Sequence, residues 1–550
     1  MRKIFILHLF SFLTLLFSAS WVDQAATPLK NRQQQILYEQ QLQKLNPPSR
    51  RTTQSKLIPP IKETNASLPC VTFHDINTSG ITLIDPKKLK KILRPYIGRC
   101  STIIDLAKLI RSINNQYIAQ GYISSFVYLE PQKLSGGVLR LSAIEGTVEK
   151  VRTVGIPQGF LFMGIQGAPL NLRRLEQSLS LLDRLKSWKT DMQIRPGRKV
   201  GTSEVVIEGN QTRFPIYGSV ALDNFGSHST GKTQLTGNLV WENILRLNDT
   251  LTISCQGTPH QNRTRRARDF SIGWGLPVGT AYLKLSYSDY RYRHPVRGIV
   301  KSYPAEGQSR DFSISIEKEM LRSRSHSGTI SLGLERKKDT NKLAHTLLDV
   351  STHRLTILNL SYTHHFSFAE GYAYLTLAYQ RGTSLWGAYR RDGISPEFSK
   401  GTFDMGIQKF FYRDGRDPLS FNFIAHGQIS QQKTPGSEMI QIGGAYSVRG
   451  FESDRSLSGN RGIYFRSELA MHTLFDKISF SPYLGLDAGF VPHNSVSVGG
   501  QIWGGTIGLR FALKDLSVHL SESFPLKDSR PKAVTGWGGK IFGLNLRWTF

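Results

Sequence analysis

Long hydrophobic runs are absent from this sequence after its first twenty residues. Charged or polar residues interrupt every later apolar stretch, whereas a membrane-spanning helix needs about 20 mostly apolar residues. The sequence therefore excludes a bundle of transmembrane helices. A mature chain that spans a membrane must do so with β-strands.

Cysteine is scarce, with three among the 550 residues. No second cysteine stands at metal-ligand spacing around Cys70 or Cys100, so we predict no metal site. In an oxidising compartment these two cysteines can form a disulfide that closes a loop of about 30 residues. A pair of buried free thiols is the alternative.

Catalytic and nucleotide-binding motifs are also missing. The chain has no HExxH and no GxSxG; GWGLPVG at 273–279 lacks the GxGxxG spacing, and GWGGK at 536–540 lacks the upstream glycine and the Ser or Thr of a phosphate loop. His364 and His365 are neighbours in a strand, so they point to opposite faces and cannot readily share an ion. We predict no enzyme and no cofactor. A hydrolase with a dispersed site is the alternative.

Acidic residues are outnumbered. Asp and Glu total 41 against 70 Lys and Arg, which gives a net charge of +29 and favours acidic partners such as nucleic acid or anionic lipid. The basic residues are spread along the chain and are not gathered on one helix or arm. A large basic secretory protein fits this pattern, and we predict no nucleic-acid partner. A soluble nucleic-acid binder is the alternative.

The first twenty residues are typical of a signal peptide. Arg2 and Lys3 precede an apolar run over residues 4–17, and small residues follow up to Ser20. We predict cleavage after residues 1–20. A single membrane anchor is the alternative, but the run is short for a spanning helix.

A short helix on a tether follows. Residues 21–45 contain a short Gln-rich helix over residues 31–45. Its weakly apolar side is marked by Ile36, Leu37, Gln40, Leu42 and Leu45. Residues 46–69 contain five prolines and read as an extended linker. A helix on such a tether can dock elsewhere in the protein and leave again.

Two compact α/β modules come next, over residues 70–146 and 147–210. Helical spacing of apolar residues alternates with short strand segments in both modules. The second module is shorter and repeats the order of the first. We predict two tandem βααββ modules.

Residues 211–550 contain no convincing helix and read as a series of alternating segments. Each segment is close to the 9 to 11 residues of a membrane-crossing strand, and aromatic residues cluster at the ends. At roughly 20 residues per strand and connection, 340 residues give about sixteen or seventeen antiparallel strands. Bacterial barrels prefer even numbers, so we predict sixteen. We predict a transmembrane β-barrel in which Phe542, Trp548 and Phe550 of the last strand face lipid and Asn545 faces a wet lumen. A soluble β-sandwich array is the alternative.

A long Gly-rich loop interrupts the strands near residues 442–462. It carries the motif Val448, Arg449, Gly450 and Phe451. An arginine inside a barrel needs a carboxylate partner, because an unpaired buried charge costs several kcal/mol. Asp487 supplies one on a following strand. A solvated loop arginine is the alternative.

Small residues surround that carboxylate. Gly485 and Gly489 stand two residues before and after Asp487 on the same face of the strand, where they leave room for a loop to approach.

Five stretches together resemble the two-partner secretion transporters, the haemolysin-activator and filamentous-haemagglutinin-transporter branch of the Omp85 superfamily. In chain order they are GYISSFVYLEPQKLSGGVLRLSAIEG, LNLRRLEQSLSLLDRL, QIRPG, LDNFGSHSTGKTQLTGNLVWENILRLNDTLTIS and GGAYSVRGFESDRSLSGNRGIYFRSELA. The first three are similar to the POTRA modules of that family, the fourth to its first barrel hairpin and the last to its plug loop. The Gln-rich start resembles transporters of contact-dependent inhibition systems.

This resemblance implies a 16-stranded barrel in the outer membrane of a Gram-negative bacterium, plugged by the N-terminal helix and by the loop with VRGF. Arg449 is expected to contact the wall motif of Asp487 and Gly489, and the pair Cys70 and Cys100 matches many members. The POTRA modules are expected in the periplasm, where they bind a secreted exoprotein: an adhesin, a haemolysin or an inhibition toxin. We predict a monomeric barrel in lipid that exports this partner without nucleotide hydrolysis.

Three further alternatives remain at this point. An Omp85-type insertase would place proteins into the membrane, and an outer-membrane enzyme would hydrolyse a substrate. A siderophore receptor needs about 22 strands, more than 340 residues comfortably provide.

Overall fold

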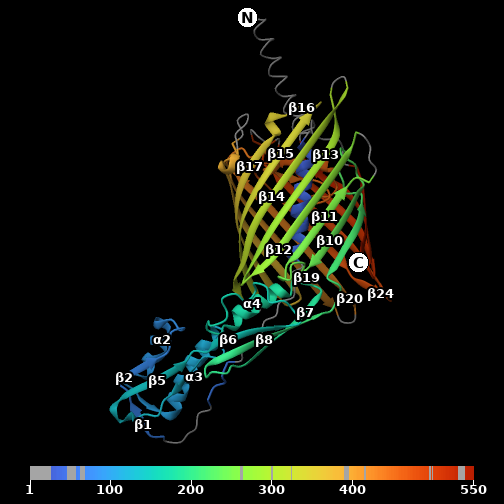
Figure 1. The fold of residues 1–550 in the computed structure, drawn as a ribbon. Coiled ribbons are helices and arrows are strands. Elements are labelled where there is room, and N and C mark those ends of the chain that lie inside the picture. The colour runs from blue at the N-terminus through green and yellow to red at the C-terminus, as the bar shows by residue number, and fades with distance from the viewer. Residues whose placement is uncertain are drawn as a thin grey trace.

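The computed structural model has a tall β-barrel with two small α/β modules below one end and a helix inside it (Figure 1). It describes residues 26–45, 57–61, 68–259, 264–298, 301–323, 325–388, 395–413, 416–494, 497, 499–530 and 539–550. The expected signal peptide and most of the linker lie outside these residues. None of the described helices is long and apolar enough to cross a membrane.

The first module packs two helices on a small sheet. Its elements are β1 (Cys70–Thr72), β2 (Asp75–Ser79), α2 (Pro86–Leu93), β3 (Cys100–Thr102), α3 (Ile103–Ala119), β4 (Phe126–Leu129) and β5 (Val138–Ile144). In α3 the residues Leu109, Ile113 and Tyr117 recur at helical spacing and are fully buried. Asp85 caps the start of α2, and Thr102 and Asp105 form a capping box at the start of α3.

The second module has one helix where we predicted two. Its elements are β6 (Thr147–Val154), α4 (Leu172–Leu182), β7 (Trp188–Pro196) and β8 (Thr202–Gln211), with β8 central in the sheet. Turns occupy residues 155–170, where Leu161 and Phe162 supply buried apolar side chains. This stretch holds four glycines with positive φ, so it cannot continue as a helix.

Within the described residues, sixteen antiparallel strands close the barrel, and β28 pairs with β9. They are β9 (Ile216–Asp223), β10 (Gln234–Glu242), β11 (Thr250–Gly257), β12 (Arg266–Val278), β13 (Ala281–Arg297), β14 (Ser302–Arg322), β15 (His326–Leu343), β17 (His353–Phe368), β18 (Gly371–Thr383), β19 (Ser399–Arg413), β20 (Arg416–Ser430), β23 (Gly462–Met471), β25 (Ile478–Val491), β26 (Gly500–Leu513), β27 (Leu516–Asp528) and β28 (Ile541–Thr549). The short β16 (Thr346–Leu347) and β24 (Thr473–Phe475) extend two of the hairpins.

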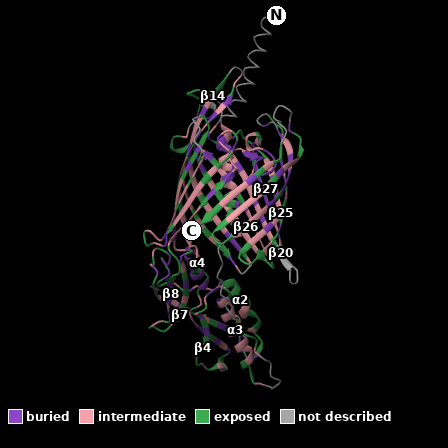
Figure 2. Ribbon diagram, turned by 90° about the vertical axis from the view of Figure 1, so that its right-hand side faces the viewer, coloured by how far each residue is buried: buried purple, intermediate pink, exposed green. Residues whose placement is uncertain are grey.

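The two faces of the wall differ as a barrel in lipid requires. Large apolar side chains such as Leu332, Leu358 and Ile507 are exposed on the outside, whereas polar side chains such as Asp404 are buried inside. Phe542, Trp548 and Phe550 are exposed as well. In Figure 2 most residues of the barrel strands are exposed or half-buried, and buried residues lie between them.

Several strands are longer than the predicted 9 to 11 residues. The longest, β14, has 21 residues, and β15 has 18. Their far ends carry charged residues on the outward face, so the strands continue past the length that an apolar band about 25 Å tall requires.

The second module sits against the lower end of the barrel (Figure 1). The backbone amides of Lys186 and Ser187 donate to the Glu242 carboxylate, at 2.7 and 2.9 Å. Phe160 forms an isolated β-bridge with Val278. These contacts join the module directly to the strand ends and turns of the wall.

Candidate functional site: the plugged lumen

The loop between β20 and β23 folds into the barrel. It covers residues 431–461 and so begins earlier than the predicted 442–462. Within it, β21 (Ile440–Ile442) pairs with β22 (Leu457–Gly459). A small apolar core joins the loop to the wall, and its buried members are Ile440, Ile442, Val448, Phe451, Leu457, Tyr464, Val491 and Ile502. We refer to this segment as the plug loop.

Arg449 of the plug loop is held by a carboxylate of the wall. Its Nε and Nη2 atoms donate to the two oxygens of Asp487 at 2.6 and 2.7 Å, and its backbone N–H donates to the same group at 2.9 Å. Arg449 is 5% exposed and Asp487 is fully buried. Such a bidentate pair fixes orientation as well as charge, so the loop is placed in one register against β25.

Glycines make room for this approach. A Cβ on Gly485 would collide with the Arg449 guanidinium, and a Cβ on Gly504 of β26 would collide with the Arg449 carbonyl oxygen. Gly489 lies beside Ile442 and Val448. The structure therefore places Asp487 against Arg449, and Gly489 against Val448, the residue before Arg449 in the motif. Gly450 has a φ of +87° and turns the chain after the arginine.

A second carboxylate at this site was missed by sequence reasoning. Glu468 of β23 accepts from Arg449 Nη1 at 2.7 Å and from Arg510 Nη2 at 2.5 Å. Arg466, two residues before it, lies 3.5 Å away. The alternation in RSELA places Arg466 and Glu468 on one face, and this was the available signal.

The start of the plug loop has an ionic anchor of its own, also missed. Glu438 lies 2.8 Å from Lys337 Nζ of β15 and 2.7 Å from Lys400 Nζ of β19. All three side chains are less than a tenth exposed. The loop is thus held by buried charges at two separate places on the wall.

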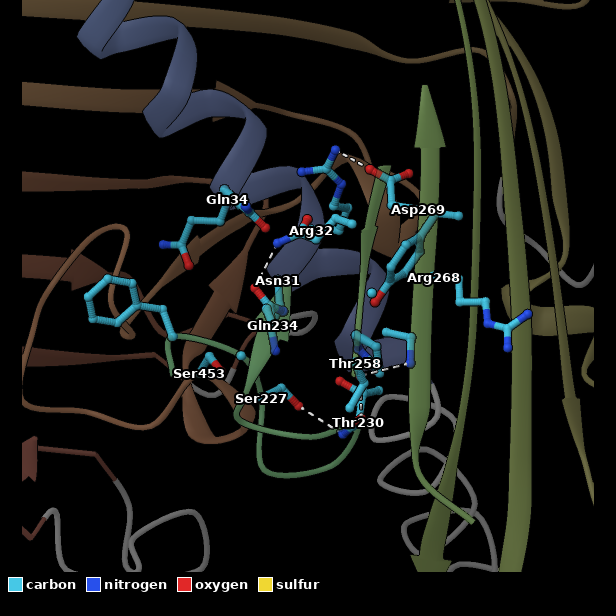
Figure 3. Close-up of a pocket in the computed structure, with 18 of the residues that line it drawn as sticks. Asn31, Arg32, Gln34, Ser227, Thr230, Gln234, Thr258, Arg268, Asp269 and Ser453 are labelled. Atoms are coloured by element: carbon cyan, nitrogen blue, oxygen red, sulfur yellow. Dashed lines mark hydrogen bonds and ion pairs between the residues drawn. The ribbon is translucent and has the colours of Figure 1, made fainter. Parts of the chain in front are cut away.

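The N-terminal helix, residues 26–45, lies in the lumen beside the plug loop and is drawn in blue in Figures 1 and 3. Gln34 Nε2 donates to the Gln441 carbonyl oxygen at 2.6 Å, and Gln441 Nε2 donates to Asn31 Oδ1 at 2.6 Å. Lower down, Gln41 Nε2 donates to Asp404 Oδ1 at 2.6 Å. We call this segment the lumen helix.

The prediction that the apolar side of this helix forms its main contact face is wrong. Gln34, Gln35 and Gln41 are buried, whereas Leu42 is 39% exposed. Leu45 is buried, against Tyr374 and Ile424 of the wall. The inner wall carries charged and hydrogen-bonding groups. Glutamines can bond to these groups, whereas an apolar helix face would leave the groups without hydrogen-bond partners.

Two charged residues attach the lumen helix to the wall, Arg32 in its first half and Lys44 at its end. Arg32 forms an ion pair with Asp269 of β12, which Figure 3 shows beside Asn31. Lys44 Nζ donates to Thr376 Oγ1 at 3.1 Å and lies 3.7 Å from Asp404. The helix therefore bridges opposite parts of the wall.

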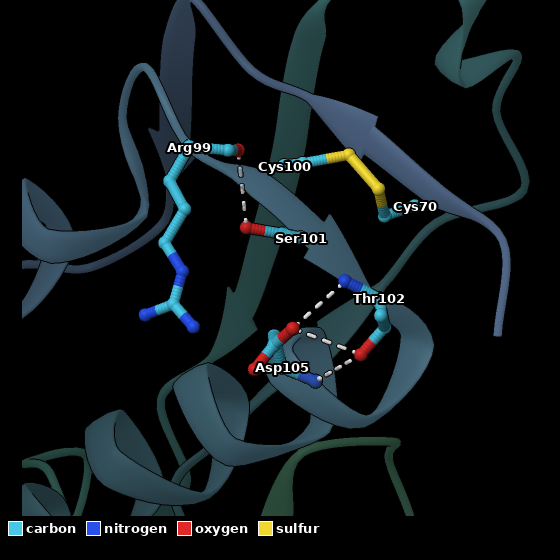
Figure 4. The surroundings of a disulfide bond; sticks show 6 residues. All are labelled: Cys70, Arg99, Cys100, Ser101, Thr102 and Asp105. Atoms are coloured by element: carbon cyan, nitrogen blue, oxygen red, sulfur yellow. Dashed lines mark hydrogen bonds between the residues drawn. A yellow bond between two sulfur atoms is a disulfide. The ribbon is translucent and has the colours of Figure 1, made fainter. Parts of the chain in front are cut away.

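In the first module, Cys70 and Cys100 are joined by a disulfide that links β1 to β3 (Figure 4). The capping box of Thr102 and Asp105 follows immediately, so the bond fixes the start of α3. Cys255 is free and exposed. No group of three potential metal ligands occurs in the part of the chain that the structure describes.

Glu145 ties the end of β5 to the loop before α2. It accepts from the backbone amides of Thr82 and Leu83 at 2.7 and 2.8 Å, and from the Tyr117 hydroxyl at 2.8 Å. Burial raises the pKa of Glu145, but these hydrogen bonds outweigh burial and leave its pKa below the ordinary value.

Comparisons with known proteins agree with this architecture. The family described as "Haemolysin secretion/activation protein ShlB/FhaC/HecB" matches residues 201–511. A "POTRA domain, ShlB-type" matches residues 71–146, and a "POTRA domain" matches residues 156–196. The first module is therefore a POTRA module of the type found in this family.

Named relatives are similar over most of their length. The "Outer membrane transporter CdiB" of Dickeya dadantii is 30% identical over 484 residues, 85% of each chain. The "Hemolysin transporter protein ShlB" of Serratia marcescens is 27% identical over 465 residues, 82% of each chain. The solved structure of CdiB from Escherichia coli matches with a TM-score of 0.81 at 27% identity, over 96% of this chain and 98% of that chain.

An insertase is not favoured, because the named relatives reported above are transporters that match most of the chain. The POTRA modules and the barrel place the protein in the outer membrane of a Gram-negative bacterium, with the modules in the periplasm. The chain belongs to the haemolysin secretion/activation protein family, the outer-membrane transporters of two-partner secretion.

Proposed function

We propose that this transporter exports one large exoprotein of the contact-dependent inhibition type through its lumen, once the lumen helix has left it. The observation that carries the proposal is the polar character of the contacts along the middle of the lumen helix. Hydrogen bonds from Gln34 and Gln41 and the ion pair of Arg32 hold the lumen helix along its length, and Leu29 and Leu45 add apolar contacts near its two ends. Water or the peptide groups of a passing chain can replace such bonds without exposing a large apolar surface.

The choice of exoprotein class rests on similarity. The relatives named CdiB include one that is 30% identical to this chain over 85% of both lengths, and the Gln-rich start resembles transporters of contact-dependent inhibition systems. Export of a haemolysin is the competing assignment, because relatives named as hemolysin transporters also match.

Recognition of the exoprotein is assigned to the POTRA modules. In the first module β4 forms an edge of its sheet, and Phe126 and Tyr128 on that strand are 45% and 38% exposed. In the second module β7 forms an edge. An extended exoprotein segment can add a strand to such an edge, with backbone hydrogen bonds giving affinity and exposed aromatic residues giving selectivity.

Arg449 is assigned the task of holding the plug loop in register while the lumen opens. The test is co-expression with the large exoprotein encoded beside the transporter, with secreted protein measured in the medium. R449A should abolish export and leave heat-modifiable migration of the barrel intact. The matched control is R455A, which removes an exposed arginine of the same loop. Normal export by R449A would contradict the assigned role.

We further infer a monomeric barrel in lipid that has no hydrolytic activity and needs no nucleotide. The support is a wall that closes on itself within one chain. Light scattering with correction for bound detergent tests the monomer. Release of phosphate or of cleaved peptide by the purified protein would contradict the second inference.

A further inference from the structure

The upper parts of β12, β13, β14 and β15 carry a basic surface that the export mechanism does not use. We call it the basic belt, and its members are Arg266, Arg268, Arg291, Arg293, Arg310, Arg336, Lys338 and Lys342. These four strands are neighbours in the wall, and β13 to β15 are seen side by side in Figure 1.

The strand register puts the belt on one face. Arg266 is opposite Arg293, Arg293 is opposite Glu306, and Glu306 is opposite Lys342. One row lower, Arg268 is opposite Arg291. Residues directly opposite each other in a sheet lie on the same face, so these side chains form a continuous patch across four strands.

This face points away from the lumen. Asp269, Tyr290 and Tyr292 alternate with the belt residues and are buried inside. The side chains of Arg291 and Arg310 are 62% and 48% exposed. Figure 3 shows Arg268 directed away from the lumen helix, on the other side of its strand from Asp269.

The belt lies at the height of the outer headgroups. Along β13, Arg291 comes about ten residues after the strand begins at Ala281 on the POTRA side. At about 3.4 Å per residue and a tilt of about 40°, this is roughly 25 Å, the height of the apolar band of an outer-membrane barrel. Below the belt the outward residues are apolar, with Tyr287 opposite Phe312 and Leu285 opposite Ile314.

The belt is short of negative charge. Asp289 lies 2.6 Å from Arg291 and 3.9 Å from Arg310, and Glu306 lies 3.2 Å from Arg293.

The other five cations of the belt, Arg266, Arg268, Arg336, Lys338 and Lys342, have no carboxylate within ion-pair distance among the described residues. Like charges directly opposite each other, such as Arg268 and Arg291, destabilise a sheet. A hollow of about 350 Å³ lies on this surface and is lined by both of these residues. An anion seated there would relieve the repulsion.

We propose that the basic belt binds the phosphate groups of phosphorylated glycolipid in the outer leaflet of the outer membrane. Arginine suits phosphate because its planar guanidinium donates two parallel hydrogen bonds to it. The apolar residues just below the belt meet the acyl chains of the same lipid. An exoprotein in transit travels on the opposite side of the wall, so it is not the occupant that this position favours.

The test uses the full-length protein in nanodiscs of phosphatidylcholine, with bound lipid counted by native mass spectrometry. The probes are bisphosphorylated lipid A, its dephosphorylated form and phosphatidylglycerol. The wild-type protein should retain bisphosphorylated lipid A at least about tenfold better than either of the other two. The variant R266Q/R268Q/K338Q/K342Q should lose this preference by about tenfold or more, since each basic residue near an anionic surface adds to binding.

The matched control removes the same number of charges elsewhere. K87Q/K88Q/K90Q/K91Q neutralises four exposed lysines of α2 in the first POTRA module and should bind lipid A like the wild type. Heat-modifiable migration checks that both variants fold.

Four results would overturn the proposal. The first is equal binding of phosphorylated and dephosphorylated lipid A, and the second is equal binding of phosphatidylglycerol. The third is displacement of lipid A by millimolar inorganic phosphate, which would indicate a site for the free ion. A belt variant that binds lipid A normally but fails to export its exoprotein would also overturn it, in favour of a protein partner.

Discussion

Neutralising Glu438 is the sharpest test of how the plug is held. The carboxylate contacts Lys337 and Lys400 at 2.8 and 2.7 Å in a place where all three side chains are less than a tenth exposed. E438Q keeps the size of the side chain but leaves Lys400 without a carboxylate partner among the described residues. Lys337 keeps a contact with Glu335 at 3.3 Å, so the expected cost is at the lower end of the range for a broken buried pair, about 3 kcal/mol.

That free energy sets the size of the effect. Because about 1.4 kcal/mol corresponds to a factor of ten, E438Q should raise the population of states with a displaced plug loop by about 100-fold. The assay is single-channel conductance in planar bilayers, scored as the fraction of time spent in large openings.

The matched control is E452Q in the same loop. Glu452 faces Lys232 at 3.8 Å, and both side chains are at least a third exposed, so this pair contributes about 0 to 1 kcal/mol. Equal opening by E438Q and E452Q would refute the reasoning. E438Q/K400Q removes the uncompensated lysine and should recover part of the closed population, which separates a charge effect from a loss of packing.

Three further predictions concern the lumen helix and the first POTRA module. Q41L removes the hydrogen bond to Asp404 and leaves a buried carboxylate less satisfied, which costs about 1 to 3 kcal/mol; conductance should rise, and hydrogen exchange along the helix should accelerate. Glu145 has a lowered pKa, so its stabilisation is complete above its ordinary pKa of 4.5 and fades as the pH falls through the lower folded value. Acid-induced proteolysis of the module should therefore be steep in the wild type and shallower in E145Q. C100S opens a loop of 30 residues and should lower the unfolding free energy of the module by about 3 to 4 kcal/mol, measured by urea-dependent proteolysis of the full chain.

The barrel was predictable because its signal is local. A strand with lipid on one side and water on the other must alternate with period two, and this pattern can be read in segments as short as the last nine residues. The contact between Arg449 and Asp487 followed from one physical requirement, that a buried arginine needs a carboxylate near small residues. Glu468 had a weaker sign: the alternation in RSELA places it on the face of Arg466, but it does not tell that Arg449 is its other partner.

The lumen helix shows where sequence reasoning fails. The amphipathic rule assumes that the buried side of a helix meets an apolar core, but this helix is buried against a polar wall. Its partners are also remote, since Gln41 and Asp404 are 363 residues apart. The prediction of two helices in the second POTRA module was wrong for a different reason. Its glycines and prolines indicate turns, but the module was expected to repeat the first one.

The contact between the two parts of the plug implies an order of opening. Hydrogen bonds between the lumen helix and neutral groups contribute about 0.5 to 1.5 kcal/mol each. The helix also has the ion pair of Arg32 with Asp269 and the hydrogen bond from Gln41 to the Asp404 carboxylate. The plug loop has Arg449 and Glu438 anchored in buried ionic sites, each costing about 3 to 5 kcal/mol to break. The helix also contacts the loop through Gln441, so the loop cannot shift there while the helix is in place. Departure of the helix is therefore the first step.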